Sequence, residues 1–136
     1  MKILVTGADG FIGRNLLYKL LEMDLYEVFT FTRGDNLKTL TSHLEIIDFV
    51  VHLAGENRPD NQELFNSTNI GLTKFICDKL KLVNKQVPII FASSIQAEQN
   101  NNYGRSKLAA EAKIQQLASA NGNDIFIYRL PGVFGK

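Results

Sequence analysis

The sequence is poor in cysteine, in long apolar runs and in excess charge, and each shortage excludes a class of protein. The single cysteine, Cys77, excludes an internal disulfide, and its place beside Phe75 and Ile76 predicts a buried, unreactive thiol. No apolar segment approaches membrane-spanning length, and the first apolar run is too short for a signal peptide. The net charge of +1 argues against a surface dedicated to nucleic acid or to an acidic membrane. We therefore expect a cytoplasmic protein that binds neither nucleic acid nor a membrane.

The chain does contain enough apolar material for one domain with a real core. It has 136 residues, of which 45% are hydrophobic and 21% charged, as in ordinary globular domains. Apolar, β-rich runs alternate with helical patterns, with strands expected near 2–6, 27–32, 48–55, 87–92 and 125–130 and helices near 11–23, 37–46, 59–83 and 103–120. This alternation predicts an α/β fold, a Rossmann-like doubly wound parallel sheet of about five strands. The gap between the second and third runs is so short that the standard third strand is missing or very short.

A glycine-rich turn follows the first strand and opens the first helix. Such a helix start offers free backbone N–H groups and a positive dipole end to a phosphate. Gly7 allows a tight turn, Gly10 allows close approach of a pyrophosphate, and Gly13 lets the helix lie close to the strand. The alternative is a plain tight turn without a ligand. The cofactor-binding residues that we predict here and at the end of the third apolar run are Gly7, Asp9, Gly10, Phe11, Ile12, Gly13, Leu53, Ala54 and Gly55.

The end of the second strand carries information on the cofactor. In dinucleotide-binding folds an acidic residue here binds the adenosine ribose, whereas an arginine accommodates the 2′-phosphate of NADP. This chain has Thr32 and then Arg33, with no carboxylate before Asp35. The pattern favours NADP(H) over NAD(H), and the alternative is that Arg33 is only a solvated loop charge.

Three residues together are typical of proton transfer beside a nicotinamide. Tyr103 and Lys107 lie four residues apart at a helix start, hence on one face, and Ser94 ends the preceding apolar strand. A nearby ammonium lowers the pKa of a tyrosine, and a serine hydroxyl can hold a carbonyl oxygen. We predict Ser94, Tyr103 and Lys107 as catalytic residues.

Two further polar residues fall on apolar faces. Asn69 lies on the buried side of the predicted helix 59–83, so it is either a structural brace or a member of the active-site network. His52 lies inside an apolar strand with no partner visible in the sequence, and we predict a structural role for it.

These motifs, taken in order along the whole chain, resemble the extended short-chain dehydrogenase/reductases. The matching segments are Gly7-x-x-Gly10-x-x-Gly13, His52-Leu53-Ala54-Gly55, Asn69-x-Gly71, Ser93-Ser94 and Tyr103-Gly104-Arg105-Ser106-Lys107. The resemblance implies that Ser94, Tyr103 and Lys107 are catalytic and that Asn69 supports the proton network. It also implies that Tyr103 and Lys107 contact the cofactor, with Lys107 binding the nicotinamide ribose.

A narrower resemblance is to the bacterial reductases of UDP-N-acetyl-L-fucosamine synthesis, which serve capsule and O-antigen formation. It rests on residues 51–59, 93–97 and 129–136, and it implies NADPH-dependent reduction of the 4-keto group of a UDP-linked 6-deoxy amino sugar. Ile95 and Gln96 stand where nucleotide-sugar dehydratases carry an Asp-Glu pair, which points to a reductase or an epimerase. Gly132 replaces the asparagine that is usual in the family.

The family continues beyond the length of this chain into a substrate lobe. We therefore expect residues 1–136 to be the NAD(P)-binding domain of a longer enzyme with a small nucleotide-sugar substrate, and a homodimer fits that expectation. Two alternatives stay open: a nucleotide-sugar epimerase that uses the same three residues, and a non-catalytic NADP-binding sensor.

Overall fold

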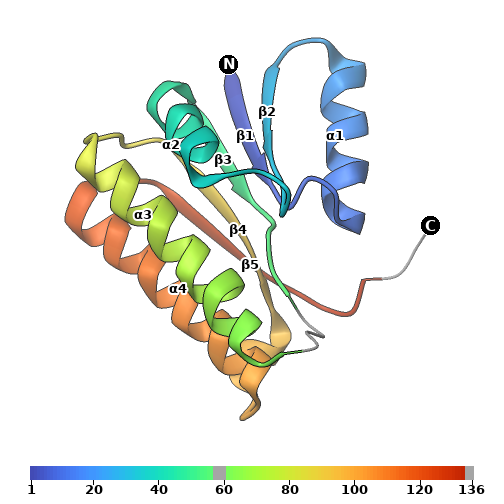
Figure 1. Ribbon diagram of the computed structural model, residues 1–136, viewed down its shortest axis with the longest axis vertical. Coiled ribbons are helices and arrows are strands. Elements are labelled where there is room, and N and C mark those ends of the chain that lie inside the picture. The colour runs from blue at the N-terminus through green and yellow to red at the C-terminus, as the bar shows by residue number, and fades with distance from the viewer. Residues whose placement is uncertain (57–60, 134–136) are drawn as a thin grey trace.

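The computed structural model describes residues 1–56 and 61–133, which form strands and helices in alternation (Figure 1). In chain order the elements are β1 (Lys2–Thr6), α1 (Phe11–Met23), β2 (Glu27–Phe31), α2 (Leu37–Ile46), β3 (Phe49–His52), the π-helix η1 (Phe65–Gly71), α3 (Leu72–Leu82), β4 (Ile89–Ser94), the 3₁₀-helix η2 (Ile95–Glu98), α4 (Asn102–Asn121) and β5 (Ile125–Leu130). Within these two ranges no helix is both long and apolar enough to cross a bilayer.

The strands form one five-stranded parallel sheet in the order β2-β1-β3-β4-β5. From β1 the chain first adds β2 on one side and then returns to add β3 on the other. The carboxyl ends of β1 and β3 therefore flank a topological switch point, where open α/β sheets bind their ligands. The predicted fold class is confirmed, including the missing third strand, because α2 alone lies between β2 and β3.

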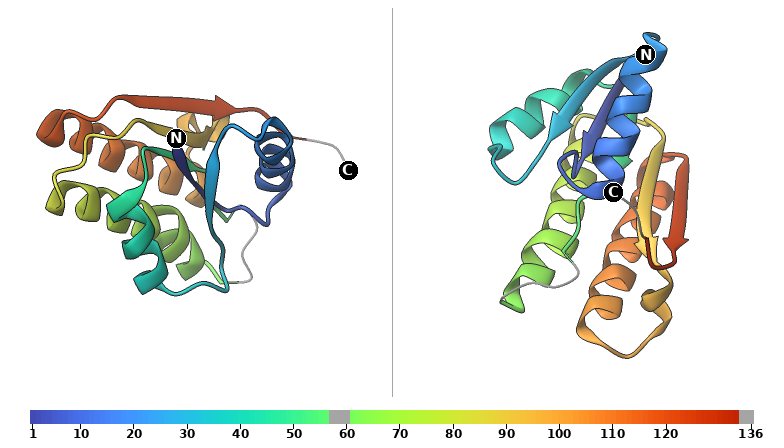
Figure 2. Two further views of the ribbon diagram at one scale, coloured as in Figure 1. Left: turned by 90° about the horizontal axis from the view of Figure 1, so that it is seen from above. Right: turned by 90° about the vertical axis from the view of Figure 1, so that its right-hand side faces the viewer.

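The two faces of the sheet are covered unequally (Figures 1 and 2). Helix α1 packs on one face, where Leu16, Leu17 and Leu20 contact a cluster around Val5 and Val51. Helices α2, α3 and α4 cover the other face over a larger core, whose fully buried members include Leu4, Leu40, Leu44, Leu80, Phe91 and Ile114. β1 and β3 are buried on both faces, which explains why they are continuous apolar runs. Over residues 125–128 of β5, half-buried and exposed residues alternate instead.

The segment between β3 and β4 differs from the single helix predicted over 59–83. Its predicted start at Pro59 and Asp60 lies outside the described residues, and the chain then forms the π-helix η1 before α3. A π-helix accommodates an extra residue in a turn, often at functional sites. Apolar spacing does not reveal such a change of pitch. The resemblance at 57–59 and 134–136 also falls outside the described residues.

Candidate functional site

Two pockets open at the carboxyl edge of the sheet and meet at the glycine turn. One, of about 500 Å³, is bounded by β1, β2 and η1, and the other, of about 380 Å³, extends past β4 to the start of α4. They share Gly7, Gly10, Leu53 and Gly55. Both therefore belong to one cleft across the topological switch point.

The turn between β1 and α1 is packed so closely that side chains are excluded from it. Gly7 has φ +68°, and a Cβ atom there would lie 2.6 Å from the backbone nitrogen of Ala54. A Cβ on Gly13 would collide with the carbonyl oxygen of Gly7. The N-cap residue Gly10 provides no side-chain cap, and the first turn of α1 has no acidic residue. The helix start therefore keeps free N–H groups facing the cleft, which suits a phosphate.

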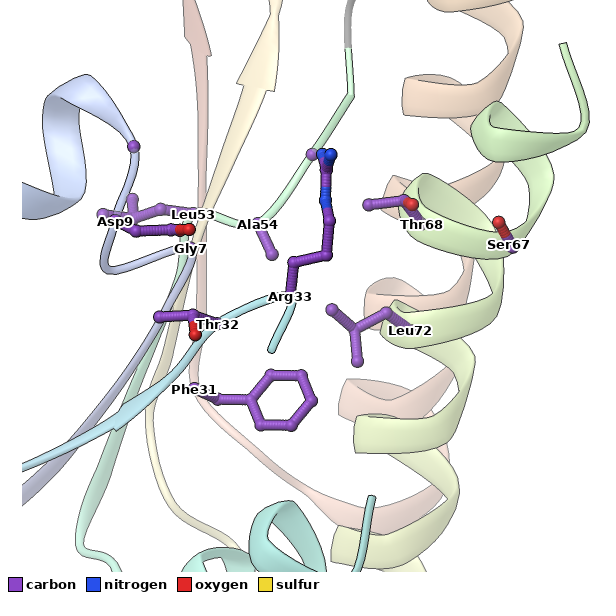
Figure 3. Close-up of a pocket in the computed structure, with 12 residues that line it drawn as sticks. Gly7, Asp9, Phe31, Thr32, Arg33, Leu53, Ala54, Ser67, Thr68 and Leu72 are labelled. Atoms are coloured by element: carbon purple, nitrogen blue, oxygen red, sulfur yellow. The ribbon is translucent and has the colours of Figure 1, made fainter. Parts of the chain in front are cut away.

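Figure 3 shows the larger pocket, with the side chain of Arg33 standing between Ala54 and Thr68. The guanidinium of Arg33 forms an ion pair with the carboxylate of Glu56, which follows the β3 strand. Asp35 faces its own loop, where one carboxylate oxygen accepts hydrogen bonds from the Thr32 N–H (2.8 Å) and the Thr32 hydroxyl (3.2 Å). Arg33 is thus the charged side chain of this loop that lines the pocket.

The second pocket brings Ser94, Tyr103 and Lys107 together, as predicted. Ser94 ends β4, and its Oγ accepts a hydrogen bond from the Gln96 N–H (3.1 Å). Asn101 caps α4 by accepting a hydrogen bond from the Gly104 N–H (2.7 Å), which places Tyr103 in the first turn of the helix.

The pKa of Tyr103 is shifted in the opposite direction from the expectation that Lys107 lowers it. Burial raises the pKa of Tyr103, and a hydrogen bond with Ser94 opposes that rise. The ammonium of Lys107 instead donates to the carbonyl oxygen of Ala92 (2.9 Å) and lies 5.0 Å from the centre of the Phe91 ring. Burial also lowers the pKa of Lys107 to about 8, against the attraction of Glu111. Lys107 is held by the sheet here rather than by the tyrosine.

Asn69 does not line either pocket but lies directly behind the cleft. Its Oδ1 accepts from the Glu56 N–H (2.7 Å), while its Nδ2 donates to the Glu56 carbonyl (2.9 Å) and to the Ser106 hydroxyl (2.9 Å). The buried amide therefore joins the segment after β3 to helix α4. A Cβ on the intervening Gly55 would approach Lys107 Nζ to 2.9 Å.

His52 is buried with both ring nitrogens in use, which confirms its structural environment. Nδ1 lies 2.6 Å from the Thr6 hydroxyl and Nε2 lies 2.8 Å from the Thr73 hydroxyl. Because Thr73 donates its own hydrogen to the Asn69 carbonyl (2.9 Å), it must accept from Nε2–H. Burial, reinforced by Lys107, lowers the pKa of His52 to about 3. The neutral ring thus binds Thr73 of α3, whose hydroxyl in turn binds the backbone carbonyl of Asn69 in η1.

Several polar residues of this region are not predicted from the sequence. Buried Ser93 donates to Glu111 (2.6 Å), and Arg129 binds both oxygens of the same carboxylate (2.8 Å each). The Arg129 hydrogen bonds lower the pKa of Glu111. The sequence does offer a way to predict Glu111, because it follows Lys107 by four residues in a helical segment and so lies on the same helix face. Glu56 offers a weaker signal, as the residue that directly follows Gly55.

Cys77 is buried as predicted, and burial raises its thiol pKa to about 12. Elsewhere in 1–56 and 61–133, no group of three His, Cys, Asp or Glu side chains is placed to hold a metal ion.

A model of the NAD dependent epimerase/dehydratase family matches residues 3–136. The chain is 46% identical over all of its 136 residues to a UDP-2-acetamido-2,6-beta-L-arabino-hexul-4-ose reductase of Pseudomonas aeruginosa strain PA103, and it covers 37% of that protein. This chain therefore spans little more than a third of the length of that relative.

Solved structures give the same picture of the fold. The capsular polysaccharide assembling protein CapF of Staphylococcus aureus superposes with a TM-score of 0.84 at 36% identity, covering all of this chain and 36% of that one. A UDP-glucuronic acid 4-epimerase of Bacillus cereus, solved in complex with NAD, superposes with a TM-score of 0.86 over 99% of this chain and 58% of its own. At 24% identity that second likeness supports the fold alone.

Proposed function

Because the chain belongs to the NAD dependent epimerase/dehydratase family, we propose that it is the cofactor-binding portion of a nucleotide-sugar reductase. The proposed reaction is NADPH-dependent reduction of the 4-keto group of a UDP-linked 6-deoxy amino sugar, for capsule or O-antigen synthesis. The observation that carries it is the continuous cleft, with Arg33 at one end and Ser94, Tyr103 and Lys107 at the other. The reductase from Pseudomonas aeruginosa and CapF support the substrate class and the pathway.

The residues of the cleft fit a dinucleotide. A side chain at Gly7 or Gly13 would collide with backbone atoms, and the uncapped start of α1 suits a pyrophosphate. Leu53 and Gly55 line both pockets and Ala54 lines the larger one, and these residues would border the middle of the cofactor. Arg33 would hold the 2′-phosphate of NADPH by a charge-assisted contact. Lys107 would hold the nicotinamide ribose. When bound, the nicotinamide supplies the hydride.

The proposed catalytic residues would have different roles at the substrate carbonyl. Ser94 would hold the substrate carbonyl oxygen through its hydroxyl, and Tyr103, whose raised pKa keeps it protonated, would donate the proton to the same oxygen. Asn69 would hold α4 and the segment after β3 in fixed positions relative to each other. Ile95 and Gln96 supply no acid or base for elimination of water, which favours a reductase or an epimerase over a dehydratase.

The experiment that tests the proposal measures binding first and hydride transfer second. NADPH and NADH are titrated into the purified chain while nucleotide fluorescence is followed, and Arg33→Ala is compared with Arg105→Ala, an exposed arginine of α4 outside both cleft pockets. We expect Arg33→Ala to weaken NADPH binding about tenfold and to leave NADH nearly unchanged. Failure of the wild-type chain to bind either nucleotide would overturn the cofactor assignment.

A UDP-linked 4-keto sugar is then added at high concentration to the chain with bound NADPH. A reductase consumes NADPH absorbance and loses that consumption in Tyr103→Phe. An epimerase would interconvert the sugar without net consumption, and a sensor would bind NADPH without either reaction. Since this chain covers about a third of the length of its relatives, we expect slow turnover and use single-turnover amounts of enzyme.

A further inference from the structure

An ion pair involves the arginine of the pocket that we assign to the adenosine end of the cofactor. Arg33 comes from the loop after β2 and lines the pocket, and its partner Glu56 directly follows Gly55, which lines the same pocket. The Arg33 side chain is 77% exposed, whereas that of Glu56 is only 17% exposed. The guanidinium that would recognise a 2′-phosphate is therefore already paired with a carboxylate.

Glu56 is anchored more firmly than an ordinary surface residue. Its backbone N–H and its carbonyl oxygen both hydrogen-bond the side chain of Asn69, at 2.7 and 2.9 Å. Asn69 is 1% exposed and is itself tied to Ser106 of α4. The carboxylate of Glu56 therefore extends from a backbone position that Asn69 holds in place next to the pocket.

We propose that Glu56 is a specificity-determining residue for the 2′ position of the cofactor. Its carboxylate competes with the 2′-phosphate for Arg33 and so holds the preference for NADPH over NADH below the value that Arg33 alone would give. The inference rests on the proposed function, because it requires that the cleft binds a nicotinamide dinucleotide.

The physical reason is a difference in charge between the two cofactors. A phosphate monoester carries a charge between −1.5 and −2 near neutral pH, so it must displace the carboxylate from Arg33 and then remain close to it. The free 2′-hydroxyl of NADH needs no cation, and a carboxylate is a good acceptor for a ribose hydroxyl. Glu56 therefore opposes the binding of one cofactor and tolerates or assists the binding of the other.

The competing explanation is an exposed ion pair without consequence. Pairs with an exposed partner are often worth almost nothing, and Arg33 could leave Glu56 at no measurable cost. The two explanations differ in what neutralisation of Glu56 does to cofactor choice, and that difference can be measured by binding alone.

The test compares Glu56→Gln with the wild-type chain in titrations with NADPH and NADH. Adenosine 2′,5′-bisphosphate and adenosine 5′-monophosphate repeat the comparison with probes that differ only in the 2′-phosphate. We expect the ratio of affinities, NADPH over NADH, to rise about fivefold in Glu56→Gln, as the removal of one nearby negative charge predicts. Glu27→Gln is the matched control, since Glu27 is an exposed carboxylate at the opposite end of β2.

Two further variants separate the effect from damage to the fold. Glu56→Asp keeps the charge and should keep a ratio close to that of the wild type. In an Arg33→Ala background, Glu56→Gln should lose most of its effect, because no cation remains to be competed for. A ratio that is unchanged or lower in Glu56→Gln, with NADPH still bound, overturns the inference and leaves the proposed function standing. Absence of nucleotide binding by the wild-type chain overturns both.

Discussion

At the scale of single residues, His52 shows how a residue that resembles a catalytic base is committed to structure. Its two ring nitrogens contact the hydroxyls of Thr6 and Thr73, and the Thr73 hydrogen is itself used by the Asn69 carbonyl. The hydrogen-bond chain admits one neutral tautomer and leaves no lone pair or N–H for a substrate. A protonated ring would need a second donor position where Thr6 already donates, and burial excludes the solvent that could compensate.

The pH dependence of stability follows from this arrangement. The folded chain holds the pKa of His52 at about 3, below its ordinary value of 6.5, so between these values only the unfolded chain binds the proton. The wild-type chain should therefore lose about 1.4 kcal/mol of unfolding free energy per pH unit below 6.5 through this residue, and regain it as the pH rises. Urea denaturation at pH 7.5 and 5.0 should give a smaller loss for His52→Gln than for the wild type.

The variant also loses hydrogen bonds, so the comparison uses the change between the two pH values rather than stability at one pH. An NMR titration of the His52 ring protons gives an independent measure. A titration midpoint near 6.5 would contradict the neutral, buried assignment.

At the scale of elements, the start of α4 can lie close to η2 because Gly104 has no side chain. A Cβ on Gly104 would collide with the carbonyl oxygen of Gln96 and lie 2.8 Å from that of Gln99. Both contacts are to backbone, which cannot move aside as a flexible side chain can. The close approach holds Tyr103, the neighbour of Gly104, over the pocket that contains Ser94.

Gly104→Ala should therefore destabilise the chain, although alanine is normally the better helix residue by about 0.5–1 kcal/mol. We expect a loss of about 1–3 kcal/mol from the forced displacement of backbone, together with weaker catalysis if the proposed role of Tyr103 holds. Gly34→Ala is the control, because nothing lies within 4 Å of a Cβ at Gly34. Thermal unfolding measures both, and equal melting temperatures for Gly104→Ala and wild type would contradict the packing argument.

The elements also show how far the sequence predicts this molecule. The five strands and the helices α1, α2 and α4 follow from apolar runs and their spacing, which are local properties. The strand-end position of Ser94 and the helix-start position of Tyr103 follow from the same reading, so their approach could be expected. The π-helix could not, because apolar spacing does not distinguish its pitch from that of an α-helix. The sequence points to Arg33, but it does not predict the pairing of Arg33 with Glu56, 23 residues away, because that pairing depends on how two loops meet.

At the scale of the whole molecule, the sheet separates a closed face from an open one. Helices α3 and α4 lie together beneath β4 and β5 (Figure 2), where Phe91 is 1% exposed. On the opposite face α1 packs against β1 and β2, and β5 leaves Phe126 and Tyr128 exposed by 47% and 53%. Alternate residues of one strand point to opposite faces, so these two aromatic side chains share the open one.

The contrast predicts very different costs for similar substitutions. Removal of one half-exposed ring, in Tyr128→Ser, should lower the unfolding free energy by about 1–2 kcal/mol, because only about half of that side chain leaves a buried environment. Phe91→Ala should cost about 3–5 kcal/mol, since it empties space inside the packed core. Denaturant titration of the two variants beside the wild type measures the difference. If Tyr128→Ser costs as much as Phe91→Ala, the prediction of an open face is contradicted, and a dependence of that cost on protein concentration would indicate that an assembly of chains buries the face.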